Sequence, residues 1–240
     1  MRLFQAFSLA FNMLTIIPFF KVHNFFKGIN GYSAMFYPLV GFFIGGFLWL
    51  AYFFLESYVP STHLSVIIFV LWVTLTGAIH LDGFSDTVDG LFVNSKRALD
   101  VMKDSHVGGM GMVFTSLFLL FKLSSLIYIQ AYYLLPLILL LSRLNALLAI
   151  YFYDYISSGV GKLIKEEFTM LCLIVAIVFA LLVAYLFSAF SLFIPSLITL
   201  IIIGIFFQKR LGGFNGDIYG FTIEVTELAL LNYIIISAAF

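Results

Sequence analysis

The chain has 240 residues, of which 63% are hydrophobic and 10% are charged. Soluble globular domains contain about 25% charged residues, so this composition is typical of a protein whose main solvent is lipid. Twelve basic and twelve acidic residues give no support for nucleic-acid binding, and the single cysteine, Cys172, excludes a disulfide framework and a thiolate metal site.

The first segment, residues 1–20, is predicted to be a helix lying along the membrane interface. It contains one basic residue, Arg2, has polar residues inside its apolar run and shows no small-residue cleavage pattern, so a removable signal peptide is not expected. The position of Arg2 fits the distribution of basic residues along the rest of the chain best if this helix does not cross the membrane.

Long apolar runs follow along the chain. A helix needs about 20 mostly apolar residues to cross a hydrocarbon core of about 30 Å. Backbone groups in lipid must pair internally, and these runs are too long for barrel strands, so helices are expected. The runs are residues 32–55, 64–79, 113–129, 134–153, 169–187, 191–207 and about 221–240. We therefore predict an all-α polytopic membrane helical bundle of about seven transmembrane helices plus the N-terminal interfacial helix, forming a single domain over residues 1–240.

An acidic motif, HLDGFSDTVDG, occupies residues 80–90 after the second run. On a helix Asp82, Asp86 and Asp89 share one stripe, because they are spaced i, i+4 and i+7. Their like charges repel, and an ionised residue deep in the membrane costs about 3 kcal/mol. Hard oxygen ligands without cysteine favour Mg²⁺ or Mn²⁺. A solvated helix end is the alternative, although capping uses one Asp rather than three on one face.

A second polar patch, MKDSHVGGMG at residues 102–111, comes directly before the third run. Glycine amides at a helix start suit the close approach of a phosphate, although glycine at a membrane helix entry also serves packing. Asp104 is a candidate to complete a metal site, and Lys103 or His106 to orient a phosphate or act as acid or base. For His106 the pattern favours a polar interfacial residue over a catalytic base.

Two basic residues, Lys122 and Arg143, lie inside apolar runs. Ionisable groups within a membrane are candidates for function. Arg143 suits a phosphate or a carboxylate of the acidic patches, whereas Lys122 is expected to snorkel or to pair with an acid.

The third patch, residues 209–227 (KRLGGFNGDIYGFTIEVTE), contains four glycines around Asn215 and Asp217. This pattern predicts a tight loop whose backbone approaches another group closely. Glu224 and Glu227, three residues apart, are predicted to share one side of the last helix, which is otherwise too apolar to carry them without a purpose.

The basic residues predict the orientation of the bundle. Nine of the twelve lie in four polar intervals, around Lys21 and Lys27, residues 96–103, residues 162–165, and residues 209–210. If each run crosses once, these intervals share one side with most of the acids, and the positive-inside bias assigns that side to the cytoplasm.

Taken together, the three patches resemble a known family. The segments GAIHLDGFSDTVDGL, ALDVMKDSHVGGMG, KRLGGFNGDIYGFTIEVTELALL and FYPLVGFFIGG are similar to signature segments of the cobalamin synthases, the adenosylcobinamide-GDP ribazoletransferases. The resemblance covers nearly the whole chain. Family members more often carry Thr at the position of Asn215 and Arg at that of His106.

The resemblance implies an enzyme that joins α-ribazole, or its 5′-phosphate, to adenosylcobinamide-GDP and releases GMP with the help of Mg²⁺. It implies corrinoid nucleotide, α-ribazole and membrane lipid as partners, leaves a homo-oligomer open, and places the chain in a prokaryotic cytoplasmic membrane with its site facing the cytoplasm. Asp89 is the candidate proton acceptor by analogy with acid-rich membrane phosphotransferases. The candidate catalytic residues are Asp82, Asp86, Asp89 and Asp104, the candidate metal ligands are Asp82, Asp86, Asp89 and Asp217, and the candidate substrate-binding residues are His80, Lys103, Ser105, Arg143, Asn215, Glu224 and Glu227.

Four other classes of protein are alternatives. A CDP-alcohol phosphotransferase would carry an Asp-Gly-x-x-Ala-Arg run, and a prenyltransferase would carry two Asp-rich motifs, whereas this chain has one Asp-rich motif and a Glu pair. A cation-coupled transporter would place ionisable residues near the midplane and often show an inverted repeat. A structural subunit would have no need for so many facing carboxylates.

Overall fold

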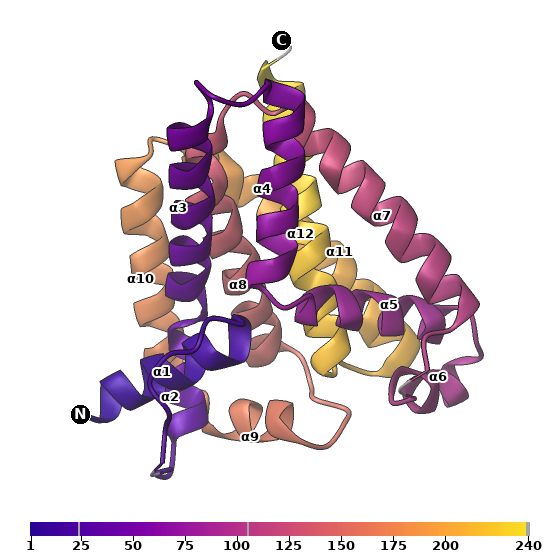
Figure 1. Ribbon diagram of the computed structural model, residues 1–240. Helices are drawn as coiled ribbons and strands as arrows, with labels where there is room; N and C mark the ends of the chain where they lie inside the picture. Colours follow the sequence, from indigo (N-terminus) through magenta and orange to yellow (C-terminus); the bar gives the residue numbers. More distant parts are fainter. Residues whose placement is uncertain (24, 105, 239–240) are drawn as a thin grey trace.

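The computed structural model describes residues 1–23, 25–104 and 106–238. The regular secondary structure in this part of the chain is helical, apart from one isolated parallel bridge between Tyr155 and Phe214. Its elements, drawn in Figure 1, are α1 (Arg2–Leu14), α2 (Ile29–Met35), α3 (Tyr37–Leu55), α4 (Ser61–Leu75), α5 (Ile79–Leu91), α6 (Ser95–Met102), α7 (Gly109–Tyr128), α8 (Leu135–Phe152), α9 (Val160–Glu167), α10 (Met170–Leu186), α11 (Phe193–Leu211) and α12 (Gly216–Ala238), with short 3₁₀ turns at Tyr132–Leu134 and Phe190–Leu192.

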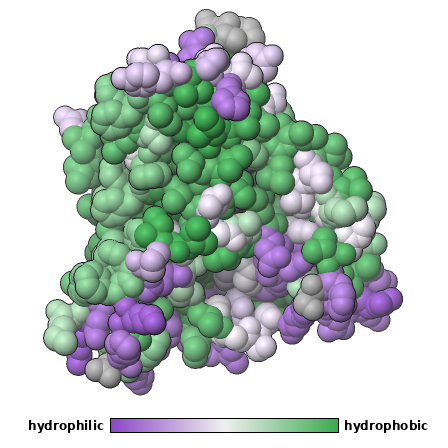
Figure 2. Space-filling model, in the orientation of Figure 1, coloured by the Kyte–Doolittle hydropathy of each residue, from purple (hydrophilic) through white to green (hydrophobic). Residues whose placement is uncertain are grey.

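The predicted all-α membrane bundle is confirmed. Five helices are long and apolar enough to cross a membrane, and two bent pairs, α4 with α5 and α9 with α10, raise the number of candidate spans to seven. Apolar side chains form a broad band across the face shown in Figure 2, with hydrophilic residues gathered at its lower end and a smaller group at its upper rim. This distribution is what a bilayer requires of the surface that it surrounds.

Helix α8 is the centre of the bundle, and its membrane-crossing segment is 94% buried. Helix α3 packs closely on it because Gly41 and Gly45 face the α8 backbone, where a Cβ atom on Gly41 would lie 2.3 Å from the carbonyl oxygen of Leu139. Small residues are the usual means by which membrane helices approach each other, since lipid provides no hydrophobic force between them.

The chain turns sharply where the acidic motif begins. Gly77 and Ala78 both have positive φ, at 60° and 55°, and α5 is bent by 83° from α4. A left-handed conformation at Ala78 costs about 1–2 kcal/mol, so the surrounding packing must stabilise this turn. As a result α5 lies across the lower end of the bundle instead of continuing through it (Figure 1).

Three short helices were not predicted. Helix α2 occupies part of the predicted run 32–55, which as a spanning helix begins only at Tyr37, and α6 and α9 have eight residues each. Together with α1, they gather with α5 at the lower end of the bundle, where α1 lies across the ends of the upright helices as expected for an interfacial helix (Figure 1).

Candidate active site

Three carboxylates from two helices meet where α5 packs against the first turn of α12. Asp82 is exposed, and Asp86 and Asp217 are half-buried. Asp86 lies within electrostatic range of Asp82, Asp217 and Asp89. The predicted helix and the convergence of the first and third patches are therefore present in the structure. Like charges held this close favour a cation beside them.

Glycines allow the two helices that carry these acids to touch. A Cβ atom on Gly83 would lie 3.0 Å from the carbonyl oxygen of Asp217, and one on Gly220 would lie 3.1 Å from that of His80. Larger residues at either position would push α12 away from α5 and separate the carboxylates. The close helix packing thus sets the spacing of the acidic site.

Asp217 lies in the first turn of α12, so the prediction that it belongs to a loop is wrong. Asn215 begins the helix, because its Oδ1 accepts a hydrogen bond from the backbone N–H of Ile218 at 2.9 Å, while its Nδ2 donates to Oδ2 of Asp217 at 2.8 Å. An acidic side chain in a first turn is also stabilised by the helix dipole. Sequence patterns favoured a loop because glycines surround the helix start.

The glycine-rich segment does approach another backbone closely, as predicted. Gly212 has φ of 85°, and a Cβ atom on Gly213 would lie 2.3 Å from the carbonyl oxygen of Asp154. The backbone N–H of Phe214 donates to that oxygen at 2.8 Å, and the N–H of Ile156 donates to the carbonyl of Phe214 at 2.9 Å. The glycine-rich backbone therefore approaches the segment that follows α8. These hydrogen bonds fix the position at which α12 begins.

Asp89 is directed away from the other acids and toward the start of α7. Its two carboxylate oxygens accept hydrogen bonds from the backbone N–H groups of Gly108 at 2.8 Å and Gly111 at 2.7 Å, and the residue is 8% exposed. The expectation that these glycine amides are free to bind a phosphate is therefore wrong, since a carboxylate of the chain already fills that place. Asp89 joins α5 to α7 in the manner of a helix cap.

We expect Asp89→Ala to lower the free energy of unfolding by about 2 kcal/mol, because two buried amides at the start of α7 lose their acceptor. Thermal or denaturant unfolding of the purified protein in detergent measures this change. Asp100→Ala, on the exposed side of α6, is the matched control and should leave stability nearly unchanged. An unaltered Asp89→Ala variant would contradict the capping role.

Within residues 1–23, 25–104 and 106–238, no three His, Cys, Asp or Glu side chains are arranged to hold a metal ion by themselves. Mg²⁺, however, is usually held by one or two carboxylates together with waters and the phosphate oxygens of a substrate. Asp82, Asp86 and Asp217 fit a site of that kind, whereas both oxygens of Asp89 are already hydrogen-bonded. Magnesium binding by Asp82, Asp86, Asp89 and Asp217 stays a prediction, and of the four Asp89 suits it least.

The second patch lies mostly in solvent. Lys103, Asp104 and His106 are exposed, and Ser105 lies outside the described residues. Oδ1 of Asp104 is 2.7 Å from Nδ1 of His106 and accepts a hydrogen bond from the His106 backbone N–H at 3.0 Å. These contacts with His106, the side-chain one first, hold the pKa of Asp104 below its usual value. Roles for Lys103, Ser105 and Asp104 in binding or catalysis stay predictions.

Two acids and two bases form a buried ion cluster between α7, α8 and α12. Nζ of Lys122 donates to Oε2 of Glu224 at 2.6 Å and to Oε2 of Glu227 at 2.5 Å, and Arg143 pairs with Oε1 of Glu227. No side chain in the cluster is more than 4% exposed. Nζ of Lys122 also lies 4.3 Å from the ring centroid of Trp72.

This ion cluster explains why two glutamates lie inside the apolar bundle. Each buried charge has an opposite charge beside it, which offsets the cost of removing it from water. Lys122 pairs with acids, one of the two outcomes expected for it. Arg143, Glu224 and Glu227 are each buried and paired within the cluster, Glu224 through Lys122. Their predicted contacts with substrate would require this arrangement to open, and those contacts stay predictions.

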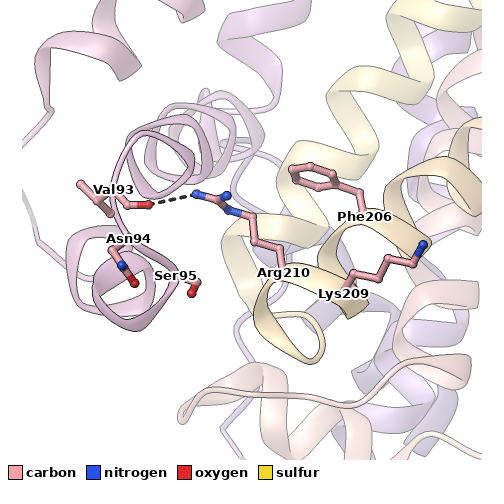
Figure 3. Close-up of a pocket in the computed structure, with 6 residues that line it drawn as sticks. All are labelled: Val93, Asn94, Ser95, Phe206, Lys209 and Arg210. Atoms are coloured by element: carbon pink, nitrogen blue, oxygen red, sulfur yellow. Dashed lines mark hydrogen bonds between the residues drawn. The ribbon is translucent and has the colours of Figure 1, made fainter.

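A polar opening with a volume of about 530 Å³ lies between the end of α11 and the α5–α6 connection (Figure 3). Arg210 points across it and donates from Nη2 to the carbonyl oxygens of Leu91 at 2.6 Å and Val93 at 2.9 Å. Lys209 extends in another direction. Arg210 thus binds the last carbonyls of α5, an attachment of α11 that sequence patterns did not predict.

Comparison with known proteins now identifies the chain. A family model described as cobalamin-5-phosphate synthase matches residues 6–235. The chain belongs to this family. Three relatives named adenosylcobinamide-GDP ribazoletransferase illustrate how similar its members are. The protein of Thermosynechococcus vestitus is 36% identical over 83% of this chain and 84% of its own length. That of Desulfitobacterium hafniense is 32% identical over 93% of each chain, and that of Acinetobacter baumannii is 32% identical over 96% of this chain and 97% of its own length.

No solved structure matches the chain. Membership of the cobalamin-5-phosphate synthase family confirms what the acidic and glycine-rich segments predicted. The described structure adds that Asp82, Asp86 and Asp217 gather at one site, that Asp89 caps α7, and that Glu224 and Glu227 lie in the buried ion cluster.

Proposed function

We propose that the chain is an adenosylcobinamide-GDP ribazoletransferase, joining α-ribazole or its 5′-phosphate to adenosylcobinamide-GDP and releasing GMP. The observation that carries the proposal is the gathering of Asp82, Asp86 and Asp217 at one end of a membrane bundle. These three carboxylates belong to a chain that is 31–36% identical, over most of its length, to relatives named adenosylcobinamide-GDP ribazoletransferase.

In this reaction a hydroxyl oxygen of α-ribazole attacks the phosphorus attached to the corrinoid. A new oxygen–phosphorus bond forms, the bond from that phosphorus to the GMP oxygen breaks, and the hydroxyl loses its proton. Such transfers depend mainly on positioning and on stabilising negative charge. When bound, Mg²⁺ would neutralise the diphosphate and the departing GMP.

Asp82, Asp86 and Asp217 would hold the magnesium ion, because they are the clustered acids with access to a substrate. Asp89 suits the proton-accepting role less well, since its oxygens already bind the Gly108 and Gly111 amides. Asp89 instead holds α5 against α7, which keeps the acidic residues of α5 in place beside the reacting groups.

The chain is a multi-pass membrane protein, and we place its acidic site on the cytoplasmic side of a prokaryotic membrane. The four basic intervals belong to the α1–α2 connection, the region from α6 to the start of α7, α9, and the end of α11. Hydrophilic residues gather at the lower end of the bundle, where α5, α6 and α9 lie (Figures 1 and 2). The positive-inside bias supports a cytoplasmic location for that end.

The direct experiment incubates the purified protein with adenosylcobinamide-GDP, α-ribazole and Mg²⁺ and measures GMP. We expect one GMP for each corrinoid product, loss of product formation after treatment with EDTA, and recovery on adding excess Mg²⁺, because the diphosphate charge is otherwise unopposed. Protein boiled before the assay is the control. Absence of GMP with all components present would contradict the proposed function, and EDTA-resistant turnover would contradict the metal requirement.

A further inference from the structure

A second cavity, of about 190 Å³, lies beside the acidic site and extends into the bundle between α1, α3, α5, α8, α9 and α12. Most of its lining is apolar, with Leu14, Ile79, Ile150, Ile164 and Ile223 among the side chains. The rings of Tyr37 and Tyr219 add aromatic surface. A concave apolar site with a few polar groups is the usual form of a small-molecule site.

Two polar side chains that line this cavity have no hydrogen-bond partner within the described part of the chain. His80 is 3% exposed and both its ring nitrogens are unpartnered, and Tyr219 is 8% exposed with an unpartnered hydroxyl. Buried polar groups are rarely left in this state, because each has lost its hydrogen bonds to water. A ligand that presents a hydrogen-bonding atom between apolar edges would complete both the packing and the polar contacts.

The cavity and the acidic site share the junction of α5 and α12. His80 and Tyr219 lie two residues from Asp82 and Asp217, on the opposite sides of their helices. Tyr155 links the two places, because its ring stacks on Tyr219 and it lies within electrostatic range of Asp217. Gly216 and Gly220 also line the cavity, and Gly220 lies where α12 touches α5. A planar group held in the cavity would therefore carry its attached sugar toward the acidic site.

We propose that this cavity holds the aromatic base of the ribazole substrate, an inference that rests on the proposed function. A benzimidazole-type base is planar, largely apolar and has one unsubstituted ring nitrogen, which accepts a hydrogen bond. Tyr219 supplies the donor from its unpartnered hydroxyl. Val160, Gly161 and Ile164 of α9 complete the lining of the cavity.

The other parts of the substrates match this cavity poorly. Its volume of about 190 Å³ is smaller than the 300–1,000 Å³ common for drug-sized ligands, so a corrin ring does not fit. A guanine base presents donors and acceptors along several edges, and a mostly apolar lining would leave them unpaired. A small apolar heterocycle with one acceptor leaves the fewest groups unsatisfied.

The test uses Tyr219→Phe, which removes the unpartnered hydroxyl and retains the ring. We expect KM for α-ribazole to rise about fivefold, the value of one hydrogen bond, while KM for adenosylcobinamide-GDP stays constant. Thermal unfolding without substrate should be unchanged or shifted upward, because the hydroxyl has no partner in the free protein. Tyr185→Phe, which lies 69% exposed on α10, is the matched control and should alter neither constant. An unchanged KM for α-ribazole in Tyr219→Phe would overturn the assignment.

A second variant, Ala146→Leu, tests the shape of the cavity. Ala146 lines it from α8, so a larger side chain reduces its volume. We expect KM to rise more for α-ribazole, whose benzimidazole carries two methyl groups, than for the riboside of unmethylated benzimidazole. Equal changes for both would overturn the assignment. The two proposals fail in different ways: if wild-type protein releases no GMP the proposed function is wrong, whereas an active wild type with unaltered variants rejects only the cavity assignment.

Discussion

Turnover is expected to fall by at least about 100-fold when Asp86 is replaced by Asn, and by a similar factor in Asp82→Asn, because each change removes a fixed negative charge that the transition state needs for its metal ion. GMP release at saturating substrate and several Mg²⁺ concentrations measures the effect. If the loss arises from weaker magnesium binding, part of the turnover should return as the Mg²⁺ concentration is raised.

Asp100→Asn, the same change on an exposed part of α6 near the same end of the bundle, is the matched control and should retain full turnover. Folding should survive in both active-site variants. Asp86 lies among like charges, so removing its charge reduces repulsion and should not lower the unfolding temperature. Undiminished turnover in the Asp82→Asn, Asp86→Asn double variant would reject the acidic site altogether.

Replacement of Lys122 by Met is the change expected to reduce stability most, by about 3–5 kcal/mol, because it leaves the buried Glu224 and Glu227 without one of their cations. The apolar volume of the side chain is nearly retained, so the loss is one of charge rather than packing. Unfolding of the purified protein in detergent gives the free-energy difference.

Lys162→Met supplies the comparison, since Lys162 is 61% exposed and its contact with Glu166 is 4.0 Å long. An exposed pair of this kind is worth about 0–1 kcal/mol. Adding Glu224→Gln to Lys122→Met should restore part of the lost stability, because one uncompensated charge is removed, and a double-mutant cycle measures the coupling. A Lys122→Met variant as stable as wild type would show that the ion cluster does not hold α7 to α12.

Apolar runs predicted the spanning helices well because lipid acts on every residue of a crossing segment in the same way. The spacing of Asp82, Asp86 and Asp89 also predicted the α5 helix correctly. Helices α2, α6 and α9 were missed because they are short and amphipathic and depend on the bundle beneath them. The position of Asp217 in a helix was missed because Asn215 starts that helix among glycines that indicate a loop.

The site itself was predictable in its residue types and only partly in its geometry. A stripe on a helix says which side chains share a face, and it does not say that Asp89 turns toward α7 while Asp86 stays with Asp82 and Asp217. That choice depends on where α7 begins, more than fifteen residues later. The ion cluster had a clearer signal, since Lys122 and Arg143 are two cations inside apolar runs and Glu224 and Glu227 are two acids in another.

The ion cluster also restricts the order of biogenesis. Lys122 and Arg143 lie on α7 and α8, whereas both carboxylates that pair with them lie on α12, at the end of the chain. While the ribosome is still making the last hundred or so residues, these two cations must enter the membrane before their counter-ions exist. Helices α7 and α8 therefore remain beside the translocon, or in a loosely packed bundle, until α12 is inserted. Closure of the bundle becomes a post-synthetic event that a truncated chain cannot complete.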